Sequence, residues 1–310
     1  EGEFMYKAVI SDLDGTLLSR GHHVTKFTKN VIKEIIKKDK GDAEAKKIIS
    51  AGDVQLKRAI EEMNKKIKKW EPDNFELELN SVWSFKERGD WATHDSKYRG
   101  NCSPYVFRNL IIRYSSPGDI ILDQFVGGGT SVIEAKLLNR DIIGVDINPK
   151  SVELSINKLN FAYGSSDVEI RIGDAQRLDF INDHSIDFIC THPPYSDIIK
   201  YSNTIDGDLS RLEYGDFLKS MESVAKESYR VLKTNKVCAF VMGDIRKKGF
   251  VKPLGFETLQ IFQNEGFSLK EIIIKQQHNC KGTSKWEKIA KQNKFILLAH
   301  EYIFVLKKCS

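Results

Sequence analysis

The sequence predicts an α/β fold in which helices cover both faces of a largely parallel sheet. From about residue 80 onward, short apolar segments alternate with helical segments, and a glycine-rich turn follows one of the apolar segments. Strands that are buried on both faces are apolar throughout, which is typical of parallel sheets. Alternation of such strands with helices therefore predicts one large domain built on a single sheet.

Seven strands and four helices are expected in this main domain, residues 80–310. The strands are expected at residues 120–123, 142–146, 168–172, 186–190, 237–242, 269–275 and 295–306. The last two are expected to form a hairpin. The helices between the strands are expected at residues 130–138, 149–157, 217–232 and 253–264.

The residues before the main domain divide into three segments. Residues 1–4, ahead of Met5, are expected to be an expression remnant, and residues 5–39 a strand, an acidic turn and a helix. Residues 40–79 are expected to form a basic helical segment, because apolar residues recur at spacings of three and four until Pro72 breaks the pattern.

Composition and charge are those of a globular chain, with 310 residues and a net charge of +5. Residues 26–70 hold 14 Lys and Arg against 7 Asp and Glu, and residues 270–294 hold 7 Lys against 2 Glu. Such stretches suit phosphate contacts, although a solvated helix face is the alternative. The five cysteines lack metal-ligand spacing, which disfavours a disulfide framework or zinc site and suggests a cytoplasmic location. No apolar run approaches ~20 residues, so neither a membrane span nor a signal peptide is expected.

The strongest indication of a ligand site is the turn between residues 120–123 and 130–138. Residues 121–131 have the letters ILDQFVGGGTS. Three glycines let the backbone approach a ligand closely and surround it with N–H groups. Dinucleotide folds use the same kind of turn, and some turns of this kind only join a strand to a helix, so the turn alone does not identify a ligand.

Acidic residues stand at three consecutive strand ends. Asp123 ends the first strand, Asp146 ends the second and Asp174 follows the third. Asp146, about 20 residues past the strand-end acid, is placed to accept hydrogen bonds from ribose hydroxyls, and Asp174 can meet an adenine amino group. Because ligands of open α/β sheets bind outside the carboxyl ends of the strands, the three acids predict one shared crevice.

The fourth strand runs into the segment Thr191-His192-Pro193-Pro194-Tyr195. This segment resembles the Asp/Asn/Ser-Pro-Pro-Tyr/Phe motif of DNA methyltransferases that act on adenine N6 or cytosine N4. The glycine turn resembles their Leu-Asp-Pro-Phe-x-Gly-x-Gly-Thr-Thr motif. Residues 91–110, with the letters KYRGNCSP at 97–104, resemble the element that closes over S-adenosylmethionine (AdoMet). The resemblance covers roughly residues 80–307 and implies the seven-stranded Rossmann-like fold of AdoMet-dependent methyltransferases.

Amino methylation accounts for the residue types of the motif. The exocyclic nitrogen is a poor nucleophile, because its lone pair is delocalised into the ring. Backbone carbonyls and a polar side chain at the start of the motif can accept the protons of the amine and so raise the electron density on its nitrogen. Pro193 and Pro194 stiffen the loop and leave carbonyls without a local partner, while Tyr195 offers a face to a flipped base. Transfer is expected by direct displacement. Methylation at cytosine C5 needs a cysteine nucleophile, typically in a Pro-Cys pair, and no proline here precedes a cysteine.

His192 stands where the family has Asp, Asn or Ser. A neutral imidazole can accept one proton from the amine through a single nitrogen. A Thr before Ser-Pro-Pro-Tyr is common in N4-cytosine enzymes, and Thr191 matches it, so cytosine is slightly favoured and adenine stays open. Gln124 replaces the family's proline, which affects only the shape of the loop.

The resemblance implies a set of site residues and partners. The segment from Thr191 to Tyr195 is expected to be catalytic, and no metal is expected. The residues expected to bind AdoMet are Tyr98, Arg99, Gly100, Asn101, Asp123, Phe125, Gly127, Gly129, Thr130, Ser131, Asp146, Ile147, Asp174 and Ala175. The expected partner is double-stranded DNA, with a cognate restriction enzyme as a further candidate, and the chain is expected to be a monomer or homodimer.

Target recognition and the last strand complete the expectations for the main domain. No separate recognition domain is evident. The candidates are residues 196–214, the basic residues 276–294 with Trp286, and the N-terminal helices. His300 and Glu301, within the last strand, are expected to be structural.

A second resemblance lies near the N-terminus. Residues 6–18, YKAVISDLDGTLL, resemble the first motif of haloacid-dehalogenase-type phosphatases, in which Asp12 would be the nucleophile and Asp14 an acid–base near Mg²⁺. The later motifs of that family do not follow, so residues 5–39 are expected to be a non-catalytic fragment. Three functions stay open: methylation of a base in DNA or RNA, Mg²⁺-dependent phosphate hydrolysis through Asp12, and nucleic-acid binding without catalysis.

Overall fold

The computed structural model describes residues 61–62, 64–278 and 283–310. The predicted segments 1–4 and 5–39 lie outside these residues, as do residues 40–60. The elements, in chain order, are β1 (Val82–Trp83), α4 (Pro104–Tyr114), β2 (Ile120–Asp123), α5 (Thr130–Leu137), β3 (Asp141–Asp146), α6 (Pro149–Lys158), β4 (Val168–Ile172), β5 (Ile186–Thr191), η2 (Ser196–Ile198), η3 (Leu209–Arg211), α7 (Tyr214–Val231), β6 (Leu232–Met242), β7 (Ile245–Lys247), β8 (Phe250–Lys252), α8 (Leu254–Asn264), β9 (Phe267–Gln276), α9 (Thr283–Asn293) and β10 (His300–Lys308).

One eight-stranded sheet forms the centre of the fold, with the strand order β1-β9-β10-β6-β5-β2-β3-β4. The neighbours from β4 to β6 are parallel, whereas β10 runs antiparallel to both β6 and β9. This order of parallel strands with one reversed strand confirms the predicted Rossmann-like methyltransferase fold. The parallel strands all end at one edge of the sheet, where a ligand is expected to bind.

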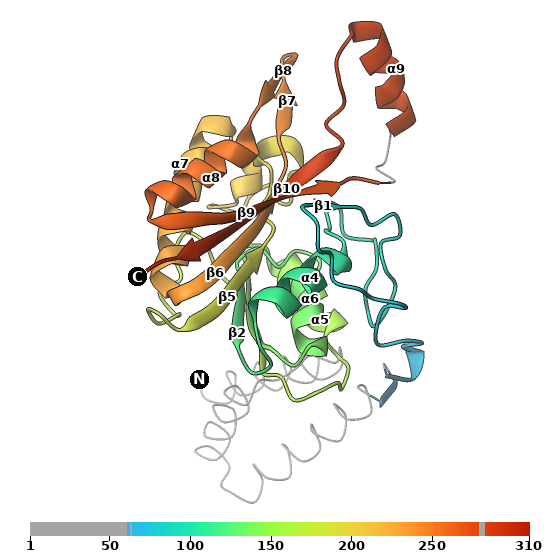
Figure 1. Cartoon of the computed structure of the whole chain (residues 1–310), viewed down its shortest axis with the longest axis vertical. Coiled ribbons are helices and arrows are strands. Elements are labelled where there is room, and N and C mark those ends of the chain that lie inside the picture. The colour runs from blue at the N-terminus through green and yellow to red at the C-terminus, as the bar shows by residue number, and fades with distance from the viewer. Residues whose placement is uncertain (1–60, 63, 279–282) are drawn as a thin grey trace, which may run out of the picture.

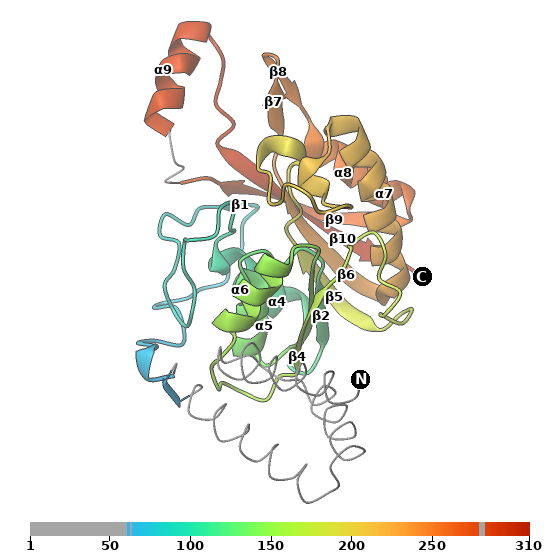
Figure 2. The ribbon, with the colours of Figure 1, turned by 180° about the vertical axis from the view of Figure 1, so that it is seen from behind.

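Helices pack on both faces because successive strand residues point to opposite sides. On β6, Val237 and Ala239 join the core that includes α4 and α5, while Cys238 and Phe240 join the core that includes α7 and α8. Every residue of β5 is buried, as expected for a strand at the centre of the sheet. Figures 1 and 2 show α4, α5 and α6 grouped apart from α7 and α8.

The structure differs from the sequence prediction in several places, most of them in the C-terminal part. The last strand starts at His300 rather than at residue 295, and it pairs with β9 as predicted but after a long connection that contains α9. The sequence does not predict the small hairpin β7–β8. The two-residue strand β1 adds an eighth member that pairs with β9. Figures 1 and 2 show the hairpin and α9 projecting beyond the same edge of the sheet.

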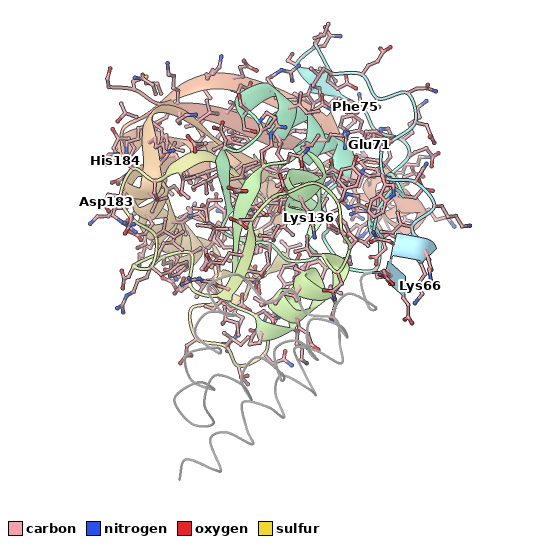
Figure 3. All side chains as sticks on the ribbon, turned by 90° about the horizontal axis from the view of Figure 1, so that it is seen from below. Lys66, Glu71, Phe75, Lys136, Asp183 and His184 are labelled. Carbon is pink, nitrogen blue, oxygen red and sulfur yellow. The ribbon has the colours of Figure 1, made fainter. Side chains whose placement is uncertain are left out.

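The chain before β1 packs onto the main domain. Trp70 lies against Phe161 and Tyr163, and the amide N–H of Glu78 donates to the Asn109 side chain at 2.8 Å. Glu71 pairs with Arg108 on α4. Figure 3 shows Lys66, Glu71 and Phe75 on one flank of the molecule, across from Asp183 and His184 on the other.

A buried carboxylate, Glu134 on α5, anchors the residues that follow β1. Its side chain is fully buried. Glu134 accepts hydrogen bonds from the Trp91 indole at 2.6 Å and from Arg108 at 3.0 Å, and it lies 2.7 Å from His94. These contacts hold residues 91–94 against the main domain, directly before the segment that carries Tyr98.

Candidate functional site

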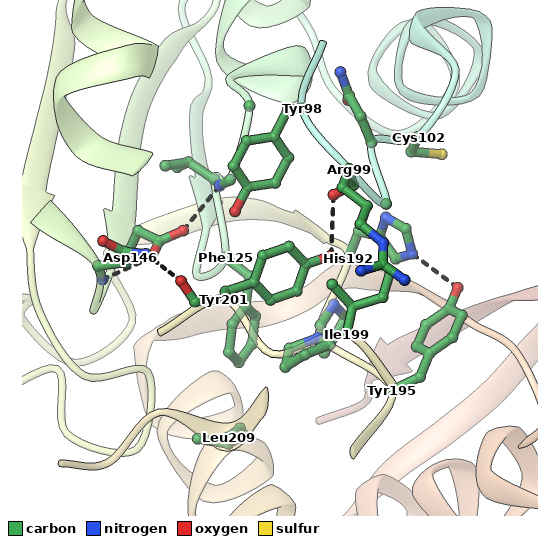
Figure 4. A pocket seen from close by; sticks show the side chains of 18 of the residues that line it. Tyr98, Arg99, Cys102, Phe125, Asp146, His192, Tyr195, Ile199, Tyr201 and Leu209 are labelled. Carbon is green, nitrogen blue, oxygen red and sulfur yellow. Dashed lines mark hydrogen bonds between the residues drawn. The ribbon is translucent and has the colours of Figure 1, made fainter. Parts of the chain in front are cut away.

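A cavity of about 530 Å³ lies at the carboxyl ends of the parallel strands (Figure 4). Ligands of open α/β sheets bind at this edge. Gly129 and Thr191 are the two predicted site residues that do not line it. The predicted residues that do line it are Tyr98, Arg99, Gly100, Asn101, Asp123, Phe125, Gly127, Thr130, Ser131, Asp146, Ile147, Asp174, Ala175, His192, Pro193, Pro194 and Tyr195.

The glycine turn needs its glycines for two physical reasons. Gly129 is the N-cap of α5 with φ of 82°, a left-handed conformation that favours glycine. A Cβ on Gly128 would lie 2.7 Å from the Cβ of Tyr98. The backbone of the turn therefore packs directly against the Tyr98 side chain, and Gly127 and Gly128 border the cavity without side chains.

Asp123 joins the glycine turn to the end of β5. Its carboxylate accepts from the Phe125 N–H at 3.0 Å, from the Thr191 hydroxyl at 2.7 Å and from the Ser131 hydroxyl. Burial raises the pKa of Asp123, and the hydrogen bonds from Ser131 and Thr191 oppose this rise. Thr191 thus faces Asp123 rather than the cavity, and it fixes where the His192 loop begins.

Asp146 stands at the end of β3 and borders the cavity. Its two oxygens accept from the Gly127 N–H at 2.9 Å and from the Asn148 N–H at 2.8 Å. Burial raises the pKa of Asp146 to about 6, although both hydrogen bonds oppose the rise. Each oxygen can still accept a further hydrogen bond, because a carboxylate offers about four lone-pair sites.

Asp174 borders the cavity beyond Asp146. Its carboxylate accepts from the Gln176 N–H at 2.9 Å, which fixes its orientation. Ile147 and Ala175, one from each neighbouring strand end, add apolar surface to the same wall. This part of the cavity therefore combines an apolar surface with two acidic acceptors.

Tyr98 and Tyr201 form a cover over the glycine turn. Their rings stack with centroids 5.5 Å apart and planes 5° apart. The Tyr98 hydroxyl lies 3.1 Å from the Ser151 hydroxyl, and the Tyr201 hydroxyl donates to the Arg99 carbonyl at 3.2 Å. Two segments far apart in the sequence thus meet across the cavity.

A series of hydrogen bonds runs from the sheet into the cavity at His192. The Lys275 ammonium donates to Glu301 at 2.7 Å, the Tyr195 hydroxyl donates to Glu301 at 2.9 Å, and His192 Nε2 lies 2.8 Å from the Tyr195 hydroxyl. Burial alone would raise the pKa of Glu301, but Lys275, His192 and the Tyr195 hydroxyl lower it to about 2. Glu301 is therefore a carboxylate that can only accept hydrogen bonds.

These hydrogen bonds determine which nitrogen of His192 carries the proton. The Tyr195 hydroxyl has one hydrogen, which it gives to Glu301, so it must accept from His192 Nε2. Burial lowers the pKa of His192, and the nearby Glu301 opposes this change. A neutral His192 with its proton on Nε2 has its Nδ1 lone pair available as an acceptor in the cavity.

The cavity wall also includes Tyr201 and Glu301, which sequence reasoning missed as site residues, and Trp286, which it placed only within a candidate recognition segment. The sequence predicts a structural role for Glu301, yet a charge within an apolar strand is a usable signal, because such charges are rarely buried without a partner. Trp286 stands out in the sequence only as part of a basic stretch. Tyr201 lies in an irregular segment whose pattern carries no sign of its stacking partner.

The cavity fits AdoMet on the features that the structure shows. Its volume is within the range of about 300–1,000 Å³ that holds ligands of this size. Asp146 and Asp174 offer acceptors for ribose hydroxyls and an adenine amino group, and Ile147 offers an apolar surface between them. A Cβ on Gly128 would clash with the neighbouring Tyr98 segment, so only glycine allows such a close approach to the backbone at this position.

Two negative observations apply to the described residues. No cluster of three or more His, Cys, Asp and Glu side chains among them could hold a metal ion. None of the helices that the structure describes combines the length and the apolar character needed to cross a membrane. Of the cysteines it describes, Cys102, Cys190 and Cys238 are buried free thiols and Cys309 is exposed.

Known proteins similar to this chain include tRNA methyltransferases and Type II methyltransferases. A tRNA (guanine(10)-N2)-dimethyltransferase of Methanothermobacter thermautotrophicus is 35% identical over 127 residues, 41% of this chain and 36% of that protein. The Type II methyltransferase M.HpaI of Haemophilus parainfluenzae is 39% identical over 88 residues, 28% of each chain. The chain thus spans about a third of the length of these relatives. Among solved structures, TrmN of Thermus thermophilus matches with a TM-score of 0.45 and 16% identity, covering 68% of this chain and 50% of that one.

The family model described as DNA methylase, for N6 and N4 methyltransferases, matches residues 23–157 and 186–309. The match includes the glycine turn, the Tyr98 segment and the loop from His192 to Tyr195, the features that surround the cavity. It extends over well more than half of the sequence. The chain therefore belongs to the N6/N4 DNA methylase family, and its cofactor is S-adenosylmethionine.

Proposed function

We propose that the chain transfers a methyl group from AdoMet to an exocyclic amino group of a base in double-stranded DNA. The observation that carries the proposal is the place of the loop from His192 to Tyr195, which borders the same cavity as Asp146 and the glycine turn. One cavity can therefore hold the methyl donor and receive a base beside it. Cytosine N4 is favoured over adenine N6, on the ground that Thr191 precedes the motif.

His192 acts on the amine of the target base. When bound, AdoMet supplies an electrophilic methyl group on a positively charged sulfur. The amine nitrogen forms the new C–N bond as the C–S bond breaks, and a proton leaves the nitrogen. His192 Nδ1, held as an acceptor by the bond from Nε2 to Tyr195, orients the amine and takes up that proton.

The prolines and Tyr195 shape the place for the base. Pro193 and Pro194 have no N–H, so the carbonyls of the loop stay available to the amine. Tyr195 offers part of its ring to the base, while its hydroxyl is engaged with Glu301. A base must flip out of the duplex to reach His192 inside the cavity, as in other enzymes that modify bases.

On the cofactor side, Asp146 and Asp174 would accept from the ribose and the adenine. Gly127 and Phe125 would border the cofactor from the turn, together with Thr130 and Ser131. Tyr98, Arg99, Gly100 and Asn101 would cover it. The Asn101 side chain already accepts from the Thr130 hydroxyl, which ties the cover to the start of α5.

The test is transfer of labelled methyl groups from AdoMet to duplex DNA, followed by nucleoside analysis. We expect N4-methylcytosine or N6-methyladenine. His192→Ala is expected to lower the single-turnover rate more than DNA affinity. Tyr195→Ala is expected to weaken stacking on the base by ~1–3 kcal/mol, with AdoMet affinity affected much less. Wild-type rates in both variants would show that this loop is not the catalytic loop.

RNA is the second candidate substrate. It is supported by the similarity to the tRNA methyltransferase of Methanothermobacter thermautotrophicus, at 35% identity over 127 residues. A structured RNA is therefore included as substrate in the same assay. Methylation of RNA alone would replace DNA by RNA in the proposal and leave the chemistry at His192 unchanged.

The similarity to Type II methyltransferases also supports a biological setting. We propose that the chain works in the cytoplasm within a restriction–modification pair, with a cognate restriction enzyme, as a monomer or homodimer. Co-purification with an endonuclease of the same target sequence would support this setting. Protection of DNA from that endonuclease after methylation is the measurement that checks it.

A further inference from the structure

Two projections rise beside the mouth of the cavity. One is the hairpin β7–β8, residues 245–252, and the other is α9 with its connection to β10, residues 283–299, which together we call the rim. Figures 1 and 2 show both projecting from the same edge of the sheet. They touch at their bases, where Arg246 donates to the Ile296 carbonyl at 2.9 Å and lies 5.0 Å from the Phe295 ring.

The rim is joined to the catalytic loop and to the cavity. Lys247 of the hairpin pairs with Asp197, directly after the loop that ends at Tyr195, at 2.6 Å. Trp286 on α9 lines the cavity and is 52% exposed. A molecule that entered the cavity would therefore pass the rim.

The rim has a strong positive charge. Its two segments hold eight Lys and Arg against one Glu. The side chains of Lys248, Lys252, Lys288, Lys291 and Lys294 are exposed. Exposed aromatic and aliphatic side chains lie among them, Phe250 at 76% and Ile296 at 84%. Basic residues with interleaved aromatic side chains are typical of surfaces that bind nucleic acids.

We propose that the rim is the surface that binds the DNA backbone on either side of the target base, with Trp286 against the flipped nucleotide. This inference rests on the proposed function. A base that reaches His192 remains attached to its strand, so the neighbouring phosphates must lie outside the mouth. Exposed lysines at that place supply the neutralising charge, and an aromatic ring at the mouth supplies a stacking surface.

Residues 196–214, the other candidate loop that the structure describes, contribute several residues to the wall of the cavity. Its position in the sequence makes it a candidate for DNA recognition, but the Tyr201 ring stacks on Tyr98 and its amide N–H donates to the Ser210 hydroxyl at 2.9 Å. The Asn148 side chain donates to the Tyr201 carbonyl at 3.0 Å. This loop covers the cofactor side of the cavity, whereas the rim projects outward beside the mouth.

The experiment measures equilibrium binding of duplex DNA as a function of salt. The variants are Lys248→Gln with Lys252→Gln in the hairpin, and Lys288→Gln with Lys291→Gln in α9. We expect the slope of log affinity against log salt to become shallower by about 0.9 for each phosphate that the variant no longer neutralises. The matched control is Lys226→Gln with Lys270→Gln, on α7 and near the start of β9, which should keep the wild-type slope.

Trp286→Ala tests the stacking role separately. We expect a single-turnover methylation rate about tenfold below that of the wild type, with a salt slope close to wild type. Unchanged AdoMet affinity shows that each variant is folded and that its cavity is intact.

The outcomes separate the two proposals. Wild-type salt slopes in both lysine variants overturn the rim inference, whatever the methylation assay shows. If DNA is methylated and the salt slopes of both lysine variants equal that of the wild type, the inference about the rim is wrong and the proposed function still stands. If the slopes become shallower but only RNA is methylated, DNA is the wrong substrate both in the proposed function and in the rim inference. A wild-type rate in Trp286→Ala removes Trp286 from the inference.

Discussion

At the scale of single residues, Glu301 controls the protonation of His192. Glu301→Gln keeps the shape but gives an amide that can donate to the Tyr195 hydroxyl, which would then donate to His192 Nε2 and place the imidazole proton on Nδ1. We expect the methylation rate to fall about tenfold or more, the equivalent of one hydrogen bond to a charged group at ~1.5–3 kcal/mol. Single-turnover methylation measures this, with AdoMet affinity unchanged. Glu222→Gln, an exposed change on α7, is the control, and equal rates in both variants would contradict the argument.

We expect AdoMet affinity to depend on pH through the protonation of Asp146. Its pKa is raised to about 6 by burial, and a ribose hydroxyl donates best to the charged carboxylate. Bound AdoMet therefore favours the deprotonated form and lowers this pKa, so affinity should be nearly constant well above this pKa and fall as the pH drops through about 6. Calorimetry across this range measures the change. Asp146→Asn should bind more weakly and show a flatter profile, and a flat profile in the wild type would argue against the ribose contact.

At the scale of elements, the charge on Glu134 holds α5, α4 and residues 91–94 together. Glu134→Gln leaves Arg108 without its fully buried counter-charge and weakens the hydrogen bonds to Trp91 and His94. Breaking a buried ion pair costs about 3–5 kcal/mol when a charge is left without a partner. Arg108 keeps its pair with Glu71, so we expect the free energy of unfolding to fall by no more than the lower end of that range. Urea unfolding measures it, with Glu222→Gln as the control. A decrease below about 0.5 kcal/mol, typical of surface changes, would show that the cluster contributes little.

The predicted and missed elements differ in what determines them. Strands β2, β3 and β5 are short, mainly apolar runs whose ends carry turn residues, and β4 alternates apolar with charged residues, so local sequence is sufficient to predict them. The β7–β8 turn has Lys248 and Gly249 with φ of 49° and 86°, where Asn-Gly would be the usual signal. The hydrogen bonds that lead to His192 depend on Glu301 lying opposite Lys275 across β10 and β9. That register is a property of the folded sheet, so no local pattern could predict it.

At the scale of the whole molecule, described residues before position 80 pack against the main domain. The family match begins at residue 23, and Asn64 donates from its side chain to the Ala162 carbonyl at 3.2 Å. Ile67 and Trp70 pack against the core that contains α4 and α5. The division into segments 5–39, 40–79 and 80–310 stays a prediction, and these contacts favour a boundary closer to the N-terminus.

The last prediction concerns the phosphatase-like segment around Asp12, which lies outside the described residues. The described residues that line the cavity lie between Tyr98 and Glu301, and the family match starts after this segment. Asp12→Asn should therefore methylate at the wild-type rate, and the wild type should release no phosphate from simple esters with Mg²⁺. His192→Ala in the same assays serves as the control, because it should lose methyl transfer. Phosphate release that depends on Asp12 would show a second active site, since the cavity at His192 has no part in that reaction.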